Sequence, residues 1–130
     1  MTTPPIPEDL RRFVLTSVPS VPFLEAMLLL RADPSQQWES AMLASRLYIR
    51  ERVAAELLAE LCTAGIARRC EPPAVHCYSF GPASDALRDR IDLLADVYSK
   101  QLVDVTHLIH SGLERKAQQF ADAFRWRKDD

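Results

Sequence analysis

Apolar side chains recur at three- and four-residue intervals along most of the chain, and this spacing predicts a mostly α-helical protein. Residues 1–7 hold three prolines and are expected to form a flexible lead-in. A short first helix follows, with Phe13 on its apolar face. A second helix, over residues 20–32, is apolar around most of its circumference, which indicates a position in the core. Two further helices are predicted over residues 41–47 and 50–64.

The apolar period changes from helical to two residues after Gly65, a residue type that commonly ends helices in a left-handed conformation. Residues 66–70 and 76–80 alternate with this shorter period on either side of two consecutive prolines. The pattern predicts an antiparallel β-hairpin, with residues 71–74 in or near its turn.

One long amphipathic helix is predicted from Ser84 onward, because its apolar positions keep to a helical period. The Ser111-Gly112 pair is the expected place for a kink, since glycine destabilises a helix interior. The apolar face is wider than one small domain needs to cover, so we expect it to form a homodimer together with the first helix. The residues expected at this interface are Phe13, Leu87, Ile91, Leu94, Tyr98 and Leu102.

The proportions of apolar and charged residues are those of one ordinary globular domain. Its 130 residues carry a net charge of −2 with 26% charged side chains, which excludes both a disordered composition and a strongly basic surface. We expect a domain over residues 8–82 and a helical extension over residues 83–130. No secretory leader or apolar span is recognisable, so the sequence predicts no membrane association and a cytoplasmic location.

The three cysteines, an odd number without a short-spaced pair, predict no disulfide framework and fit a reducing compartment. Cys70, His76 and Cys77 lie close together across the predicted hairpin, but a fourth ligand and the usual zinc spacing are missing. In some strand registers Cys70 and Cys77 would face each other and form a redox pair. Cys62 is expected in the core.

Motifs for catalysis are missing from the sequence. We find no glycine-rich phosphate loop, no nucleophile elbow and no paired histidine–glutamate metalloprotease motif. The sequence therefore predicts a protein that is not an enzyme and that uses no metal or cofactor.

The predicted order of helices, hairpin and long terminal helix resembles a winged helix-turn-helix protein. Residues 22–81 resemble the winged helix of MarR-like bacterial transcriptional regulators. The stretch "RVAAELLAELCTAGIARR" looks like the recognition helix of that family, followed by its glycine-terminated entry into the wing. This resemblance implies a mostly α fold with a small β-hairpin wing and a long C-terminal helix. It also implies a DNA-binding transcriptional regulator that acts as a dimer.

In such proteins the recognition helix enters the major groove and the wing touches the neighbouring backbone. Arginine binds guanine or phosphate, and a small alanine lies against a thymine methyl group. Carried over to this sequence, the resemblance implies double-stranded DNA as the partner. The implied contact residues are Arg46, Arg50, Arg52, Ala55, Arg68, Arg69 and His76.

Ala55 and Glu56 depart from the family pattern, which usually has polar and basic residues at these positions. Residues 40–81 contain five arginines and four glutamates, a net of +1, which is a weak electrostatic footprint for DNA binding. The alternative hypothesis is a protein-interaction adaptor that binds no DNA. In that case the glutamates at positions 51, 56 and 60 would complement a basic protein partner.

Overall fold

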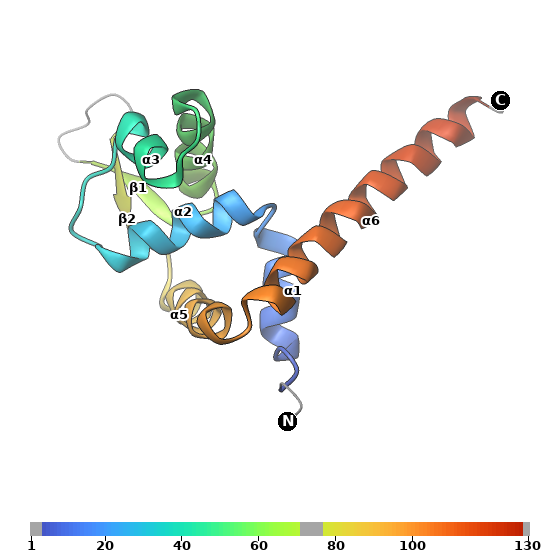
Figure 1. The fold of residues 1–130 in the computed structure, drawn as a ribbon, viewed down its shortest axis with the longest axis horizontal. Coiled ribbons are helices and arrows are strands. Elements are labelled where there is room, and N and C mark those ends of the chain that lie inside the picture. The colour runs from blue at the N-terminus through green and yellow to red at the C-terminus, as the bar shows by residue number, and fades with distance from the viewer. Residues whose placement is uncertain (1–3, 71–76, 129–130) are drawn as a thin grey trace.

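The structure is a computed structural model that describes residues 4–70 and 77–128. Within these residues the fold is mostly α-helical with one small antiparallel hairpin, as the sequence predicts (Figure 1). Residues 71–76, which include His76 and the predicted turn, lie outside the described part. The elements in chain order are α1 (Glu8–Ser17), α2 (Val21–Ala32), α3 (Ser40–Leu47), α4 (Glu51–Thr63), β1 (Ala67–Arg69), β2 (Tyr78–Phe80), α5 (Asp85–Lys100) and α6 (Leu102–Lys128).

Helix ends follow the local signals in the sequence. The N–H of Phe23 donates to Ser20 Oγ at 3.2 Å, so Ser20 caps α2 in the usual way. Ser84 caps α5 by accepting from the N–H of Leu87 at 3.1 Å. After α4, Gly65 has a φ of 78°, the left-handed conformation that glycine adopts without a steric penalty.

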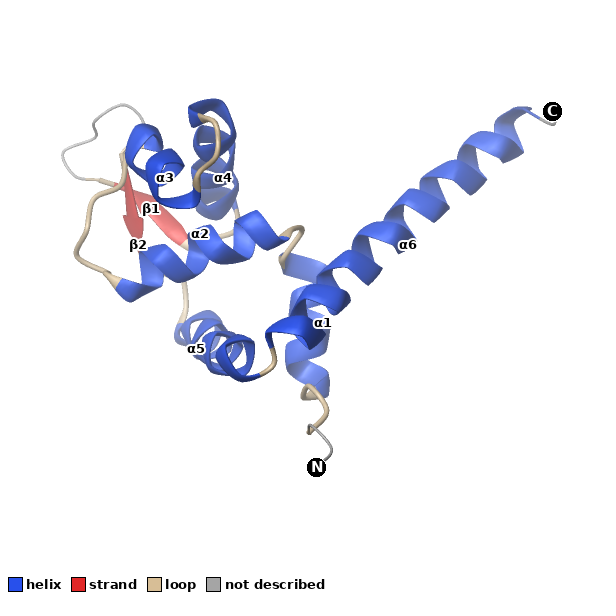
Figure 2. Cartoon of the chain, in the orientation of Figure 1, coloured by secondary structure: helices blue, strands red, loops and turns tan. Residues whose placement is uncertain are grey.

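The hairpin follows α4 directly, and its strands contact α4 and α2 (Figure 2). Its strands pair antiparallel, with Ala67 opposite Phe80 and Arg69 opposite Tyr78. Trp38, in the link between α2 and α3, adds an isolated bridge to Tyr78 through two backbone hydrogen bonds of 2.7 and 2.9 Å. The link before α3 is thereby fixed to the outer edge of β2.

The prediction of no disulfide framework is wrong for one pair, because the strand register is one of those that bring Cys70 and Cys77 together and a disulfide joins them. Cys70 follows β1 and Cys77 precedes β2, so the strand register sets them opposite each other with their Cα atoms 5.4 Å apart. The N–H of Cys70 also donates to the carbonyl of Cys77 at 3.1 Å. Cys62, on α4, is a free and half-buried thiol rather than a fully buried core residue.

Opening this disulfide is expected to lower the free energy of unfolding by about 2–3 kcal/mol, because the bond closes a short loop in the unfolded chain. The two cysteines are seven residues apart. Urea unfolding with and without a dithiol reductant measures the difference. The double substitution Cys70→Ser/Cys77→Ser should match the reduced wild type, whereas Cys62→Ser should keep the response to reductant. Coincident oxidised and reduced unfolding curves would contradict the bond.

The single long helix predicted from Ser84 is in fact two helices. α5 ends at Lys100 and α6 begins at Leu102, with Gln101 at φ −134° and ψ 51° between them. The predicted kink at positions 111–112 is also wrong, because α6 continues through Gly112. A Cβ atom on Gly112 would lie 3.3 Å from Leu15 Cδ2, so this glycine lets α1 and α6 approach closely.

The hydrophobic core collects side chains from all six described helices and from the hairpin. α6 enters it only through its first half, where Val105, Leu108 and Ile109 are buried. Beyond Gly112 the described side chains of α6 are exposed, and the helix extends away from the rest of the chain (Figure 1). Among the described helices none is by itself long and apolar enough to cross a membrane. α1 and α2 would reach that length and apolar content only as a pair bent by 109°.

Three of the six residues predicted for the homodimer interface are already covered by the fold of one chain. Phe13, Ile91 and Leu94 are at most 5% exposed. The apolar stripe of α5 packs against α1 and α6 of the same chain, a cover that the sequence pattern did not reveal.

The other half of the predicted interface is at least partly accessible. Leu87 and Tyr98 are half-buried and Leu102 is 53% exposed. Burial raises the pKa of the Tyr98 phenol above its ordinary value, with a further upward contribution from the charge of Glu25 and an opposing one from a hydrogen bond with Thr106. Tyr98 packs against the hydrophobic core of its own chain.

Candidate nucleic-acid interface

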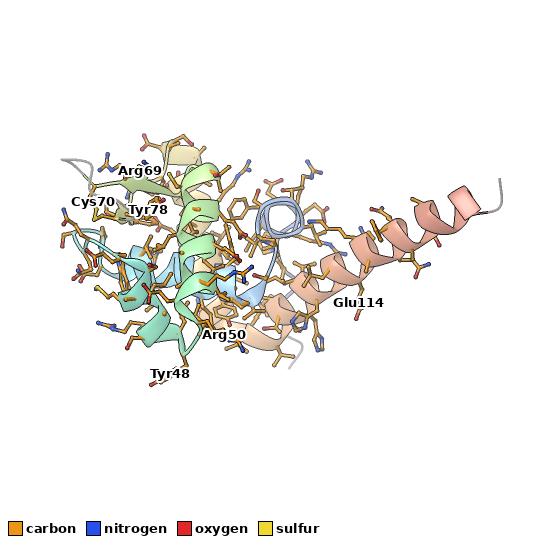
Figure 3. The ribbon with its side chains drawn as sticks, turned by 90° about the horizontal axis from the view of Figure 1, so that it is seen from above. Tyr48, Arg50, Arg69, Cys70, Tyr78 and Glu114 are labelled. Carbon is orange, nitrogen blue, oxygen red and sulfur yellow. A yellow bond between two sulfur atoms is a disulfide. The ribbon has the colours of Figure 1, made fainter. Side chains whose placement is uncertain are left out.

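The turn between α3 and α4 presents an unusual tyrosine. Tyr48 closes α3 with φ 56° and ψ 43°, and its N–H bonds to the carbonyl of Ala44. An L-residue with a Cβ atom costs roughly 1–2 kcal/mol in this left-handed conformation, which is why glycine or asparagine usually stands here. The side chain is 96% exposed, and Figure 3 shows it projecting away from the helices.

α4 has one buried face and one open face. Ala54, Leu57, Leu58 and Leu61 are buried against the core, as their spacing predicts. Val53 shares this three- and four-residue spacing but is 38% exposed. The open face carries mainly charged and small side chains: Glu51, Arg52, Glu56, Ala59 and Glu60, with Ala55 half-buried beside them.

The three arginines of this region are not equivalent. Arg46, on α3, places its guanidinium 5.8 Å from the centre of the Trp38 ring, a cation–π arrangement. Arg52 forms an ion pair with Glu56, with 3.5 Å between Nε and Oε1. Arg50 occupies the N-cap position of α4 and is exposed. Among the described residues no carboxylate lies within ion-pair distance of Arg50.

Glu56 thereby has a partner on its own helix. The pair with Arg52 spans one helical turn, and its side chains are 90% and 59% exposed, so it is worth at most about 1 kcal/mol. A phosphate could displace Glu56 from Arg52 at small cost. In the free protein, however, the pair cancels one of the predicted DNA-binding charges.

Arg68 and Arg69 are exposed on β1 and add two cations from the hairpin. The aliphatic part of Arg68 crosses Gly81, where a Cβ atom would lie 2.6–2.9 Å from its side-chain atoms. Figure 3 places Arg69 beside Cys70 near one end of α4, and Tyr48 with Arg50 near the other. The structure therefore separates Arg50 and Arg52, at the start of α4, from Arg68 and Arg69 on the hairpin. His76 lies outside the described residues.

A surface hollow lies away from these residues. It is an open hollow of about 650 Å³ between α1, α4, α5 and α6, lined by Phe13, Phe23, Ile66 and Leu87 among others. Of the predicted DNA-binding residues, none that the structure describes lines it. Within the described part of the chain, no group of three histidine, cysteine or carboxylate side chains is placed to hold a metal ion.

Tyr48 is the residue of this region that sequence reasoning missed. Its signal was its position directly between two predicted helices, where a residue in the left-handed conformation commonly closes the first helix. Comparisons of the chain with protein-family models, with curated proteins and with solved structures give no match.

Proposed function

We propose that the protein is a winged-helix DNA-binding regulator that acts as a homodimer, with α4 in the major groove and the β1–β2 hairpin on the adjacent backbone. The observation that carries the proposal is the arrangement of α3, α4 and the hairpin. Two helices joined by a tight turn are followed at once by a two-stranded hairpin with exposed arginines on its first strand. The bridge between Trp38 and Tyr78 supports the same architecture, because it adds a third strand-like segment from the link before the helix pair.

The exposed cations support a backbone-dominated mode of binding. Arg50, Arg68 and Arg69 are exposed and, within the described residues, form no ion pair. They are available to neutralise phosphates, which supplies most of the non-specific affinity of DNA-binding proteins. Arg52 joins them once a phosphate replaces Glu56 as its partner.

The exposed apolar side chains of α6 support the proposed homodimer. Leu102, Leu113 and Phe120 are 53%, 42% and 72% exposed. They are separated by 11 and 7 residues, about three and two helical turns, so they lie on one side of the helix. A second copy of the chain would cover this stripe and would supply the second recognition helix that a palindromic site requires.

Placing charges on this stripe is expected to convert the dimer into a monomer. The double substitution Leu113→Glu/Phe120→Glu would bring four carboxylates into the dimer interface, a large desolvation cost. Light scattering at tens of micromolar protein measures the mass. Gln119→Glu, on another side of the same helix, is the control and should leave a dimer. A wild-type protein of monomer mass at that concentration would contradict the proposal.

The DNA-binding proposal is tested by anisotropy titration of labelled genomic fragments at low and moderate salt. A regulator of this kind should bind at low salt and lose affinity steeply as salt rises, because binding releases counterions. Wild-type protein that binds no fragment at low salt would reject the proposal.

The second candidate is the protein-interaction adaptor, which one observation favours. The Arg52–Glu56 pair makes the middle of the open face of α4 neutral, while Tyr48 and Val53 expose apolar surface nearby. Aromatic side chains are common anchors in protein interfaces. Capture of a basic protein partner that is lost with Glu56→Arg, in a chain that binds no DNA, would support the adaptor.

A further inference from the structure

We propose that Tyr48 is itself a DNA contact: its hydroxyl group donates a hydrogen bond to a backbone phosphate and so sets the position of α4 in the groove. This inference rests on the proposed DNA-binding function. It adds an uncharged residue to the proposed DNA contacts. Tyrosine hydroxyl groups are among the donors that proteins use for phosphate contacts.

Folding stability does not account for a tyrosine at this position. The backbone is left-handed, a conformation in which a Cβ atom is unfavourable. Packing of the ring does not offset this cost, because the side chain is 96% exposed. Glycine at position 48 would relieve the backbone without losing buried area. A strained backbone that carries an unpacked aromatic side chain is typical of a residue that acts on a partner.

The surroundings of Tyr48 favour a phosphate as that partner. Arg46 precedes it by two residues and Arg50 follows it by two, and both are exposed. Glu51, also exposed, is the nearest acidic residue along the chain. The three arginines and two glutamates of residues 46–56 leave a net charge of +1, and the Arg52–Glu56 pair removes one of each sign. The residues next to Tyr48 along the chain therefore carry more positive than negative charge.

The left-handed backbone also determines where the ring can reach. The N–H groups of Tyr48 and Ile49 both bond to the carbonyl of Ala44, so the turn is held at its base. Tyr48 lies three residues before the first residue of α4, and Figure 3 shows it at the same end of α4 as Arg50. The Tyr48 side chain is long enough to contact a phosphate beside the first turn of α4, because only two residues separate Tyr48 from the start of that helix.

Three substitutions separate the hydroxyl, the ring and the backbone. Tyr48→Phe removes the hydroxyl group alone and should weaken DNA binding about tenfold for each copy of the chain in contact with DNA, the effect of losing one hydrogen bond to a charged group. Tyr48→Gly should weaken binding at least as much, while its Tm stays equal to or rises above that of the wild type. Tyr48→Asn should behave like Tyr48→Gly in stability, because asparagine tolerates the left-handed conformation.

Salt dependence distinguishes the tyrosine from the arginines. A neutral donor releases no counterion when it binds phosphate, so Tyr48→Phe should lower affinity without changing the slope of affinity against salt. Arg50→Ala should lower both the affinity and the slope, the slope by about one unit for each phosphate that the variant no longer neutralises. Ser35→Ala, which removes an exposed hydroxyl group between α2 and α3, is the control and should bind like wild type.

Anisotropy titrations of these variants at three salt concentrations, with thermal unfolding of each, decide the matter. Wild-type affinity in Tyr48→Phe would overturn the hydrogen bond, and a lowered Tm in Tyr48→Gly would overturn the argument that the tyrosine does not serve folding. If the wild type binds no DNA, the proposed function and the role of Tyr48 fail together. If the wild type binds and Tyr48→Phe binds equally well, only the role of Tyr48 fails.

Discussion

Replacing Arg50 and Arg52 together by alanine is expected to weaken DNA binding by several kcal/mol per dimer, since each good arginine contact with a base or phosphate contributes about 1–3 kcal/mol. Arg50 should account for more of the loss than Arg52. Arg50 has no ion pair among the described residues, whereas Arg52 must first exchange Glu56 for the DNA. Titrating the single and double variants against the same labelled fragment measures both effects.

The matched change in the opposite direction is Glu56→Arg. It removes a carboxylate from the open face of α4 and leaves Arg52 without an ion-pair partner, so affinity should rise and depend more steeply on salt. If Arg50→Ala/Arg52→Ala binds as well as wild type, the helix start is not the contact surface. If Glu56→Arg lowers DNA affinity instead, Glu56 accepts a specific hydrogen bond from a base, as a glutamate can from cytosine.

Truncating the buried face of α4 is expected to have a comparably large effect on stability. Leu58 is fully buried, so Leu58→Ala should lower the free energy of unfolding by about 2–5 kcal/mol. A small domain is stable by only about 5–15 kcal/mol, and the loss would be a large part of that. Urea unfolding followed by circular dichroism measures it.

Val53→Ala on the same helix is the control, because the Val53 side chain is 38% exposed. Its free energy of unfolding should change by about 0.5 kcal/mol or less. Equal losses in the two variants would mean that the faces of α4 are assigned wrongly, and with them the surface offered to DNA.

Local signals in the sequence predicted the parts of the fold that depend on near neighbours. Ser20 and Ser84 cap α2 and α5, the two helices whose starts were predicted at these positions. Gly65 ends α4 in the left-handed conformation. The hairpin was recognisable because alternation, prolines and a preceding glycine agree. These features need only the residues within a few positions of each other.

The features that sequence reasoning missed depend on contacts between distant segments. The break at Gln101 leaves no trace in the apolar period, because α5 and α6 both pack on the same core and glutamine is a good helix former. The Cys70–Cys77 bond required the exact strand register, which the alternation left open. Phe13 and Ile91 were assigned to a dimer because their cover within the chain was not visible.

For the candidate site, the sequence located the helix and the hairpin but not the state of each side chain. The charge count of +1 pointed to a weak footprint, and the structure gives part of the reason in the ion pair between Arg52 and Glu56. Tyr48 went unnoticed because composition and charge give no weight to an uncharged exposed side chain. Its backbone conformation, which the sequence does not display, makes it a candidate.

Because the helix breaks at Gln101, a small change of angle between α5 and α6 displaces the far end of α6 by a large distance. With 27 residues, α6 is about 40 Å long, so a rotation of about 10° at this joint sweeps its far end through about 7 Å. That displacement equals about two base-pair steps along DNA. If two copies of the chain meet through α6 as proposed, the angle between α5 and α6 sets the distance between their α4 helices. A change of a few degrees there, far from any arginine, would alter which spacing of half-sites the dimer fits.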